Sequence, residues 1–120
     1  MSIINKYDSC IGITLFRFFS YRAEIWFCPS GYEIVEHTHP GENVELIYLW
    51  GDTVFYRRNN NDGLLEQAIP KFGKFFTVKY YHSHWFKVGI KPLIFINLQK
   101  FLPGSIPMSA AKDFKITKNT

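Results

Sequence analysis

The stretch GYEIVEHTHPGENVELIYLWG, residues Gly31–Gly51, carries the pattern from which the fold and the chemistry of this chain are inferred. It holds His37 and His39, two of the four histidines, with one residue between them. In an extended strand, residues two positions apart point to the same face of the sheet. The two imidazoles are therefore aimed at one place, and neutral imidazole is a common protein ligand of transition metals. Glu42 and Glu45 follow and add two carboxylates to the same region.

The other two histidines, His82 and His84, repeat this spacing in the segment KYYHSHWF. Two pairs with same-face spacing make a metal site the leading hypothesis. The alternative is that the histidines lie on exposed strand faces without a metal. Strand alternation puts Phe86 on the face of His84, which predicts an apolar interior there. Ser83 falls on the opposite face and is expected to meet solvent, while Trp85 on that face must pack on another side chain.

The composition is that of one ordered globular domain. A chain of 120 residues is long enough to bury one core and too short for two domains. Its apolar content of 47% argues against disorder, and its aromatic content of 18% favours a strand-rich fold. The net charge of +4 comes partly from the lysines of residues 111–120. No Lys/Arg cluster accompanies a stacking platform, so nucleic acid is not an expected partner.

The cysteines and the apolar runs bear on the compartment. Cys10 and Cys28 form no C-x-x-C motif, so two free thiols are expected, with a disulfide as the alternative. The first ten residues lack the apolar core of a signal peptide. The longest apolar runs, such as Leu93–Ile96, are far too short to span a bilayer. We therefore expect a soluble, cytoplasmic protein with no membrane partner.

Short runs of β-branched and aromatic residues alternate with turn signals along the chain. Gly51-Asp52 predicts a tight turn, and Asn59–Gly63 predicts a hairpin loop, because Asn, Asp and Gly tolerate positive φ. After Pro103-Gly104 the tail is expected to form one helical turn around Ser109–Phe114 or to wrap the barrel. The expected strands are Ile13–Phe19, Ala23–Phe27, Tyr32–His39, Glu45–Trp50, Thr53–Arg58, Leu64–Pro70, Phe75–Lys79, His82–Val88 and Leu93–Lys100.

Many short strands with almost no helix predict an all-β fold, either a small antiparallel barrel or a jelly roll. We expect one domain over residues 1–120, with the barrel spanning about 11–102 and a C-terminal tail over 103–120. A barrel turns alternate residues inward, so it can hold a polar site inside an apolar wall.

The stretch from Gly31 to Gly51 resembles the first motif of the cupin superfamily. That motif reads glycine, five residues, H-x-H, three or four residues, glutamate, six residues, glycine. Here Gly31 precedes His37-Thr38-His39 by five residues, and Gly51 matches the closing glycine. The glutamate departs from the pattern, because Glu45 follows His39 after five residues and Glu42 comes too early.

A later segment resembles the second cupin motif, which reads glycine, five residues, P-x-G, two residues, histidine, three residues, asparagine. Counting from Gly73 places His84 at the histidine. Lys79, Tyr81 and Val88 stand where proline, glycine and asparagine are usual. The ligand histidine is therefore kept, while the residues that shape the turn and the end of the motif are not. The two motifs occur in the family order.

The resemblance implies a small single-domain cupin, a double-stranded β-helix or jelly-roll barrel. Its metal ligands map to His37, His39, Glu45 and His84. Three imidazoles and one carboxylate suit Fe(II), which is our first choice, and also Mn(II), Ni(II) or Zn(II). A one-residue slip of the strand register turns Glu45 to the other face, and Glu42 is then the carboxylate.

His82 is the candidate catalytic residue, as a general acid or base beside the metal. Its other candidate roles are a further metal ligand and a hydrogen-bond donor behind a ligand. The resemblance implies a metal-dependent enzyme that acts on a small organic molecule, with a dioxygenase as the first choice. A sugar or keto isomerase, in which the metal acts as a Lewis acid, is the enzymatic rival.

Two non-enzymatic hypotheses stand beside these. One is a binding module that holds a small ligand or a metal in the barrel. The other is an interaction protein whose working surface is an exposed aromatic patch around Trp26, Trp50 or Trp85. Cupins often pair through their outer strands, so a homodimer is the expected assembly.

Overall fold

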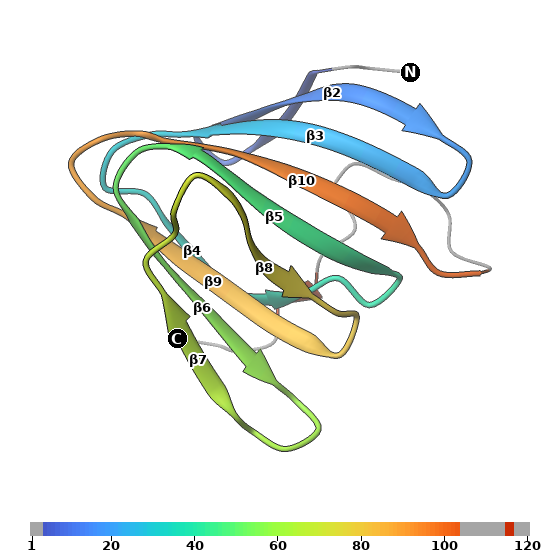
Figure 1. Cartoon of the computed structure of the whole chain (residues 1–120). Coiled ribbons are helices and arrows are strands. Elements are labelled where there is room, and N and C mark those ends of the chain that lie inside the picture. Colours follow the sequence, from blue (N-terminus) through green and yellow to red (C-terminus); the bar gives the residue numbers. More distant parts are fainter. Residues whose placement is uncertain (1–3, 104–114, 117–120) are drawn as a thin grey trace.

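The computed structural model describes residues 4–103 and 115–116, where eleven β-strands form two antiparallel sheets (Figure 1). The first sheet has the strand order β1-β2-β3-β10-β5-β8, and the second has the order β11-β4-β9-β6-β7. The strands are β1 (Ile4–Tyr7), β2 (Cys10–Phe18), β3 (Tyr21–Cys28), β4 (Glu33–Thr38), β5 (Glu42–Trp50), β6 (Thr53–Asn59), β7 (Leu65–Ala68), β8 (Gly73–Val78), β9 (His82–Val88), β10 (Leu93–Phe101) and β11 (Lys115–Ile116).

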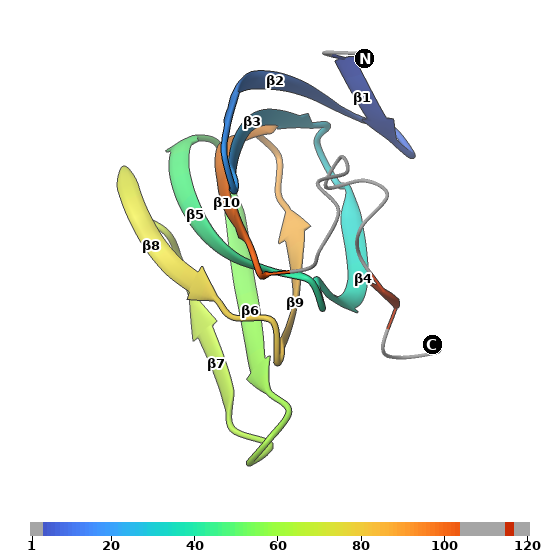
Figure 2. The same cartoon turned by 90° about the vertical axis from the view of Figure 1, so that its right-hand side faces the viewer.

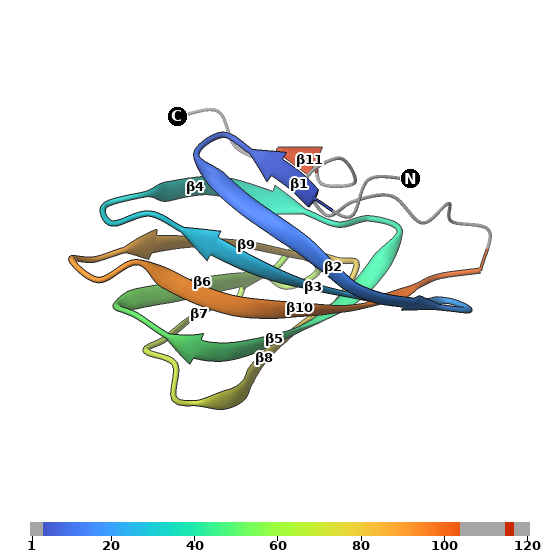
Figure 3. The ribbon, with the colours of Figure 1, turned by 90° about the horizontal axis from the view of Figure 1, so that it is seen from above.

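The chain winds back and forth between the two sheets. From β3 to β6 each strand lies in the sheet opposite to the one before, and the same holds from β7 to β10. As a result β10 lies between β3 and β5, while β9 lies between β4 and β6. Figure 2 shows the two sheets curving around a common interior, and Figure 3 shows the same barrel from above. This topology is a double-stranded β-helix, so the predicted fold class is confirmed.

The expected strands lie close to the observed ones, and His82–Val88 coincides with β9. The prediction missed β1, because its sequence INKY has no apolar alternation, and it missed the two-residue β11. The helical turn expected around Ser109–Phe114 lies outside the described residues. Within residues 4–103 and 115–116, no helix has the length and apolar character needed to cross a membrane.

The predicted turn at Gly51-Asp52 joins β5 to β6. Gly51 has a φ of 114°, and a Cβ at this position would lie 2.0 Å from the carbonyl oxygen of Pro92. Only glycine fits this close approach to the loop before β10. The predicted hairpin loop joins β6 to β7, with Gly63 at a φ of 78° and the Asn59 amide donating to the carbonyl of Leu64.

An aromatic core fills part of the barrel interior. Phe55, Phe86 and Phe95 come from β6, β9 and β10, and their ring centroids lie 5.0–5.9 Å apart. All three side chains are buried, and each contributes about 1.5–3 kcal/mol through removal of its apolar surface from water. Phe86 therefore lies on the inner face as predicted.

The outer face of β9 differs in part from the expectation. Trp85 was expected to pack on another side chain, and it packs on Tyr56 of β6, with the ring centroids 5.2 Å apart and the rings nearly parallel. Ser83, expected to meet solvent, is fully buried, and its hydroxyl donates to the Glu36 carboxylate at 2.5 Å. The same carboxylate accepts a hydrogen bond from Arg58. Ser83 is buried because this polar network covers it.

Candidate metal centre

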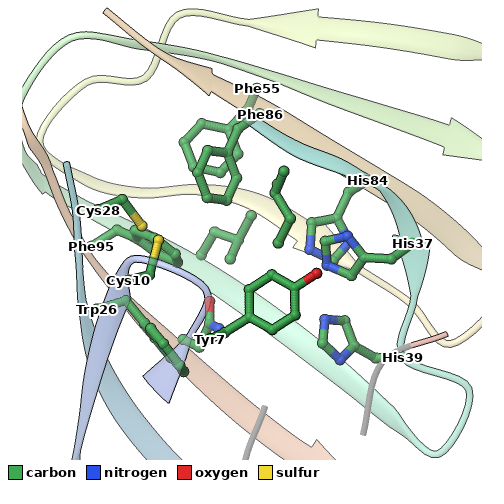
Figure 4. Close-up of a pocket in the computed structure, with 13 residues that line it drawn as sticks. Tyr7, Cys10, Trp26, Cys28, His37, His39, Phe55, His84, Phe86 and Phe95 are labelled. Carbon is green, nitrogen blue, oxygen red and sulfur yellow. The ribbon is translucent and has the colours of Figure 1, made fainter. Parts of the chain in front are cut away.

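Three histidines converge on the inner face of the second sheet. His37 on β4 pairs directly with His84 on β9, and His39 follows just after the end of β4. The ring centroids of His37 and His84 lie 4.1 Å apart, and that of His39 lies 5.1 and 5.2 Å from them. One nitrogen from each ring lies within 4.8 Å of the others, and all three residues are buried (Figure 4).

A β-bulge in β4 sets the faces of these residues. The register of β4 against β9 shifts between Ile34 and His37. Ile34 and His37 both line the same cavity although they lie three residues apart, which plain alternation does not allow. The extra residue of the bulge brings both side chains inward. From His37 onward, alternation places His39 on the same side.

The second nitrogen of His37 has a fixed role. Its Nδ1 lies 2.8 Å from the carbonyl oxygen of Val35. A carbonyl can only accept, so Nδ1 of neutral His37 carries the proton and Nε2 keeps its lone pair. Hydrogen bonds of this kind orient histidine ligands in metal proteins.

Glu42 stands next to His39. Its Oε1 lies 3.6 Å from Nδ1 of His39, and both side chains are almost fully buried. The two residues are joined by a tight turn in which the amide of Glu42 donates to the carbonyl of His39 at 3.2 Å. This turn carries the carboxylate back toward the imidazole. Glu42 is therefore the carboxylate placed either to orient His39 or to act as a fourth ligand.

His84 is buried together with the other two histidines of the cluster. Burial, together with the neighbouring His37 and His39, lowers its pKa well below the ordinary value of 6.5, so the ring is neutral at neutral pH. Its Nδ1 is buried and has no hydrogen-bond partner among the described residues. An unpaired buried nitrogen costs about 1–3 kcal/mol, and a metal ion bound by this atom would remove that cost. The donor set and the burial thus fit a transition metal.

The structure does not bring Glu45 to the histidines. On β5, Val44 and Leu46 are buried in the core, so Glu45 points to the outer face. Its carboxylate pairs with Lys74 of β8 at 3.1 Å, and its side chain is 38% exposed. The placement of Glu45 as a ligand is corrected: the turn after His39 shifts the face by one residue relative to the motif count, and Glu42 takes the inner position.

His82 also lies apart from the cavity that the cluster faces. Its Nδ1 accepts the backbone N–H of Lys79 at 2.9 Å, and its ring contacts Tyr81. Burial and then the nearby Arg57 lower its pKa, which keeps the ring neutral. The side chain thus closes the turn before β9. The predicted catalytic position beside the metal is corrected, because a lone pair committed to this turn does not face the cavity.

The cavity beside the histidines is small and largely apolar. It has a volume of about 50 Å³. No Lys, Arg, Asp or Glu occurs among its described lining residues. The lining consists of the three histidines with Tyr7, Cys10, Trp26, Cys28, Ile34, Leu46, Phe55, Phe86, Phe95 and Asn97. Cys10 and Cys28 are free thiols, and the hydrogen bond with Cys10, followed by burial, raises the pKa of Cys28.

Tyr7 and Asn97 line the cavity and were not singled out in the sequence, whereas Trp26, named there only for an exposed aromatic patch, is buried. Tyr7 pairs with Cys10 across the β1–β2 hairpin, so it turns inward with that residue, and Figure 4 shows its hydroxyl directed toward the histidines. Trp26 and Asn97 occupy inward positions of β3 and β10. The signal available for Asn97 was a polar amide at an inward position of the strand LIFINLQKF.

A double-stranded β-helix with a buried histidine cluster in its interior defines a jelly-roll protein with a candidate metal centre. The comparisons with solved structures identify the fold as that of the cupins. CapF from Staphylococcus aureus, a capsular polysaccharide assembling protein, matches with a TM-score of 0.76 and 13% identity over 97% of this chain and 32% of its own. The chain thus spans about a third of the length of CapF.

Two further neighbours carry the fold in their names. An uncharacterized protein from Klebsiella pneumoniae with a double-stranded β-helix domain matches with a TM-score of 0.68 and 17% identity, over 98% of this chain and 92% of its own. The cupin domain of Schizosaccharomyces pombe Cnp3 matches with a TM-score of 0.66 and 15% identity, over 82% of this chain and 65% of its own. No family model and no curated protein sequence matches this chain.

Proposed function

We propose that this cupin-fold protein binds one divalent transition metal through His37, His39 and His84. The observation that carries the proposal is the convergence of three buried histidines, one of which, His84, has a buried Nδ1 with no hydrogen-bond partner among the described residues. Neutral imidazole is the form that binds metals, and burial keeps His84 in that form. Glu42 lies close enough to His39 to support or complete the donor set.

We further propose that the loaded protein is an enzyme acting on a small organic molecule held in the adjoining cavity. Three imidazoles with one carboxylate suit Fe(II) first, and Mn(II), Ni(II) or Zn(II) next. When bound, such a metal supplies Lewis acidity and, as iron, the redox chemistry that reactions with dioxygen require. A dioxygenase is the activity we put first.

The residues of the chain have distinct parts in this proposal. The carbonyl of Val35 holds the proton of neutral His37 at Nδ1, so the lone pair that can bind a metal is on Nε2. The aromatic wall, including Phe55 and Phe86, keeps bulk water away from the cavity. Exclusion of water strengthens every electrostatic interaction inside the site.

The experiment is oxygen uptake by the iron(II)-loaded protein across a panel of diketones, thiols and phenols. We expect uptake with at least one compound, and its loss in His84→Ala. His82→Gln is the matched control, because His82 lies outside the cavity, and it should retain activity. Absence of uptake with every compound in a fully loaded protein would refute the dioxygenase and shift weight to a sugar or keto isomerase or a non-catalytic binding module.

We also propose a homodimer that uses the β2–β3 hairpin. Large apolar side chains stand exposed on this hairpin, and Phe19 at its tip is 88% exposed. Exposed patches of this kind commonly mark interfaces. The exposed residues are Leu15, Phe16, Phe18, Phe19 and Tyr21. Light scattering should give twice the chain mass of 14.1 kDa for the native protein and the chain mass for Phe18→Glu. A native monomer contradicts the proposal.

A further inference from the structure

The wall of the cavity across from the histidines carries two polar atoms that lack partners. The indole Nε1 of Trp26 and the amide Oδ1 of Asn97 are buried, and neither has a hydrogen-bond partner among the described residues. Both residues line the cavity. One atom is a donor and the other is an acceptor. Each costs stability when left unpaired in an apolar interior, so this pair points to a ligand that satisfies both.

Neighbouring strands hold the two side chains close together. β3 and β10 pair so that Phe95 lies opposite Trp26, and Asn97 is the next inward residue along β10. Diagonal neighbours on adjacent strands are about 7–8 Å apart, a span that a short molecule can bridge.

The position of the Trp26 ring is set by a glycine. Gly12 of β2 lies directly opposite Trp26, and a Cβ at Gly12 would lie 2.5 Å from the indole Cε2. The ring therefore packs flat against the bare backbone of β2, and glycine at this position leaves the room that it needs. This packing limits how far the indole can swing, so its N–H keeps its place in the cavity wall.

The size and the charge of the cavity restrict the ligand. A cavity of about 50 Å³ has room for more than one water molecule but only for a short organic ligand. No charged side chain lines the cavity among the described residues, and a charged ligand there would lose its hydration without a counter-charge. The ligand that fits is short and uncharged, with one acceptor and one donor.

We propose that the cavity binds short, uncharged α-hydroxyketones, with the ligand carbonyl accepting from Trp26 Nε1 and the ligand hydroxyl donating to Asn97 Oδ1. This deepens the proposed function by naming the substrate class of the same site, and it rests on that function for the placement beside a metal. The contacts with Trp26 and Asn97 themselves need no metal. Binding can therefore be tested on the chelator-treated protein and on the zinc-loaded protein.

The test uses the indole N–H signals in ¹H–¹⁵N correlation spectra of the full chain. The three tryptophans give three signals, and Trp26→Phe assigns that of Trp26. We expect hydroxyacetone to move the Trp26 signal in a saturable way and to leave the signals of Trp50 and Trp85 in place. Acetone, which keeps the carbonyl and lacks the hydroxyl, should bind about 2–13-fold more weakly, as expected for one lost hydrogen bond. Glycolate, which is charged, should not bind.

Asn97→Leu replaces the amide by apolar atoms of similar size. It should weaken hydroxyacetone about 2–13-fold and leave acetone unchanged. Trp85→Phe, on the outer face of the second sheet, is the control that should alter neither. A well-dispersed spectrum in which hydroxyacetone leaves the Trp26 signal unmoved overturns the inference. So does equal weakening of both ligands by Asn97→Leu.

The two proposals fail in distinguishable ways. If the protein holds a metal and hydroxyacetone does not reach Trp26, the cavity inference fails alone. If hydroxyacetone binds with the expected pattern and no metal is held, the metal function fails and the binding site stands.

Discussion

Replacement of His84 by leucine separates the part that this residue plays in metal binding from its part in the fold. The ring is buried within the cluster, opposite His37, and its Nδ1 has no hydrogen-bond partner among the described residues. Leucine fills most of the same space with apolar atoms. In the metal-free protein the change removes an unpaired polar atom that costs about 1–3 kcal/mol. We therefore expect metal-free His84→Leu to be at least as stable as the metal-free native chain.

The loaded proteins should behave in the opposite way. A metal present at 100 times its Kd stabilises the native chain by about 2.7 kcal/mol. For a domain of this size each kcal/mol raises Tm by roughly 4 °C, so the expected shift is about 10 °C. His84→Leu should show almost no shift at the same metal concentration. The assay is thermal unfolding by circular dichroism with and without Fe(II) under anaerobic conditions.

Two results would refute this reasoning. One is a metal-free His84→Leu protein that is several kcal/mol less stable than the native chain, which means that His84 is needed for the core itself. The other is a Tm shift in His84→Leu as large as in the native chain, which places any metal elsewhere.

Three further predictions follow from the placement of the other residues. Glu42→Gln should weaken metal binding about 10–100-fold while Glu45→Gln leaves it unchanged, measured by competition with a chromophoric chelator; equal effects contradict the placement of the two carboxylates. Burial lowers the pKa of His84 below its ordinary 6.5, so below pH 6.5 the unfolded chain takes up a proton that the folded chain does not. The free energy of unfolding of the metal-free protein should therefore be full above pH 6.5 and fall by about 1.4 kcal/mol per pH unit below it. A flat urea-denaturation profile from pH 7.5 to 5 contradicts this. Gly12→Ala should displace the Trp26 ring and lower the free energy of unfolding, measured by urea denaturation, by about 1–3 kcal/mol. At Gly31 an added Cβ meets no atom, so Gly31→Ala should show only the smaller cost of its positive φ. Similar losses of stability in both variants argue against the close packing at Gly12.

The histidines could be predicted because their placement follows from short-range rules. Residues two positions apart in extended chain point to the same face, and this holds for His37 and His39 after the bulge. Their meeting with His84 depends on the pairing of β4 with β9, which the family order of the motifs implied. Burial of Phe86 beside His84 followed from the same alternation.

The carboxylate could not be predicted from counting. The two-residue repeat holds only within a strand, and the tight turn between His39 and Glu42 interrupts it. The motif count favoured Glu45, but β5 begins at Glu42 with that residue turned inward. His82 was placed beside the metal for a similar reason, since alternation fixes a face and not the depth along the barrel. The Nδ1 atom of His82 instead accepts the backbone N–H of Lys79 in the turn before β9.

The cavity wall lay beyond the reach of local patterns. Tyr7 faces the histidines only because the short β1 folds back against β2, and INKY gives no strand signal. The relation between Trp26 and Asn97 depends on the pairing of strands that are far apart in the chain. Such pairings set which inward residues share a cavity, and they are global properties of the fold.

The central claim is that His37, His39 and His84 bind one metal ion per chain. Equilibrium dialysis against Fe(II), Mn(II), Ni(II) and Zn(II) in turn, followed by elemental analysis, measures it most directly. We expect one ion per chain for at least one of these metals in the native protein and in Glu45→Gln, and none in His84→Leu. Native protein that retains no metal, or His84→Leu protein that retains as much as the native chain, would contradict the claim.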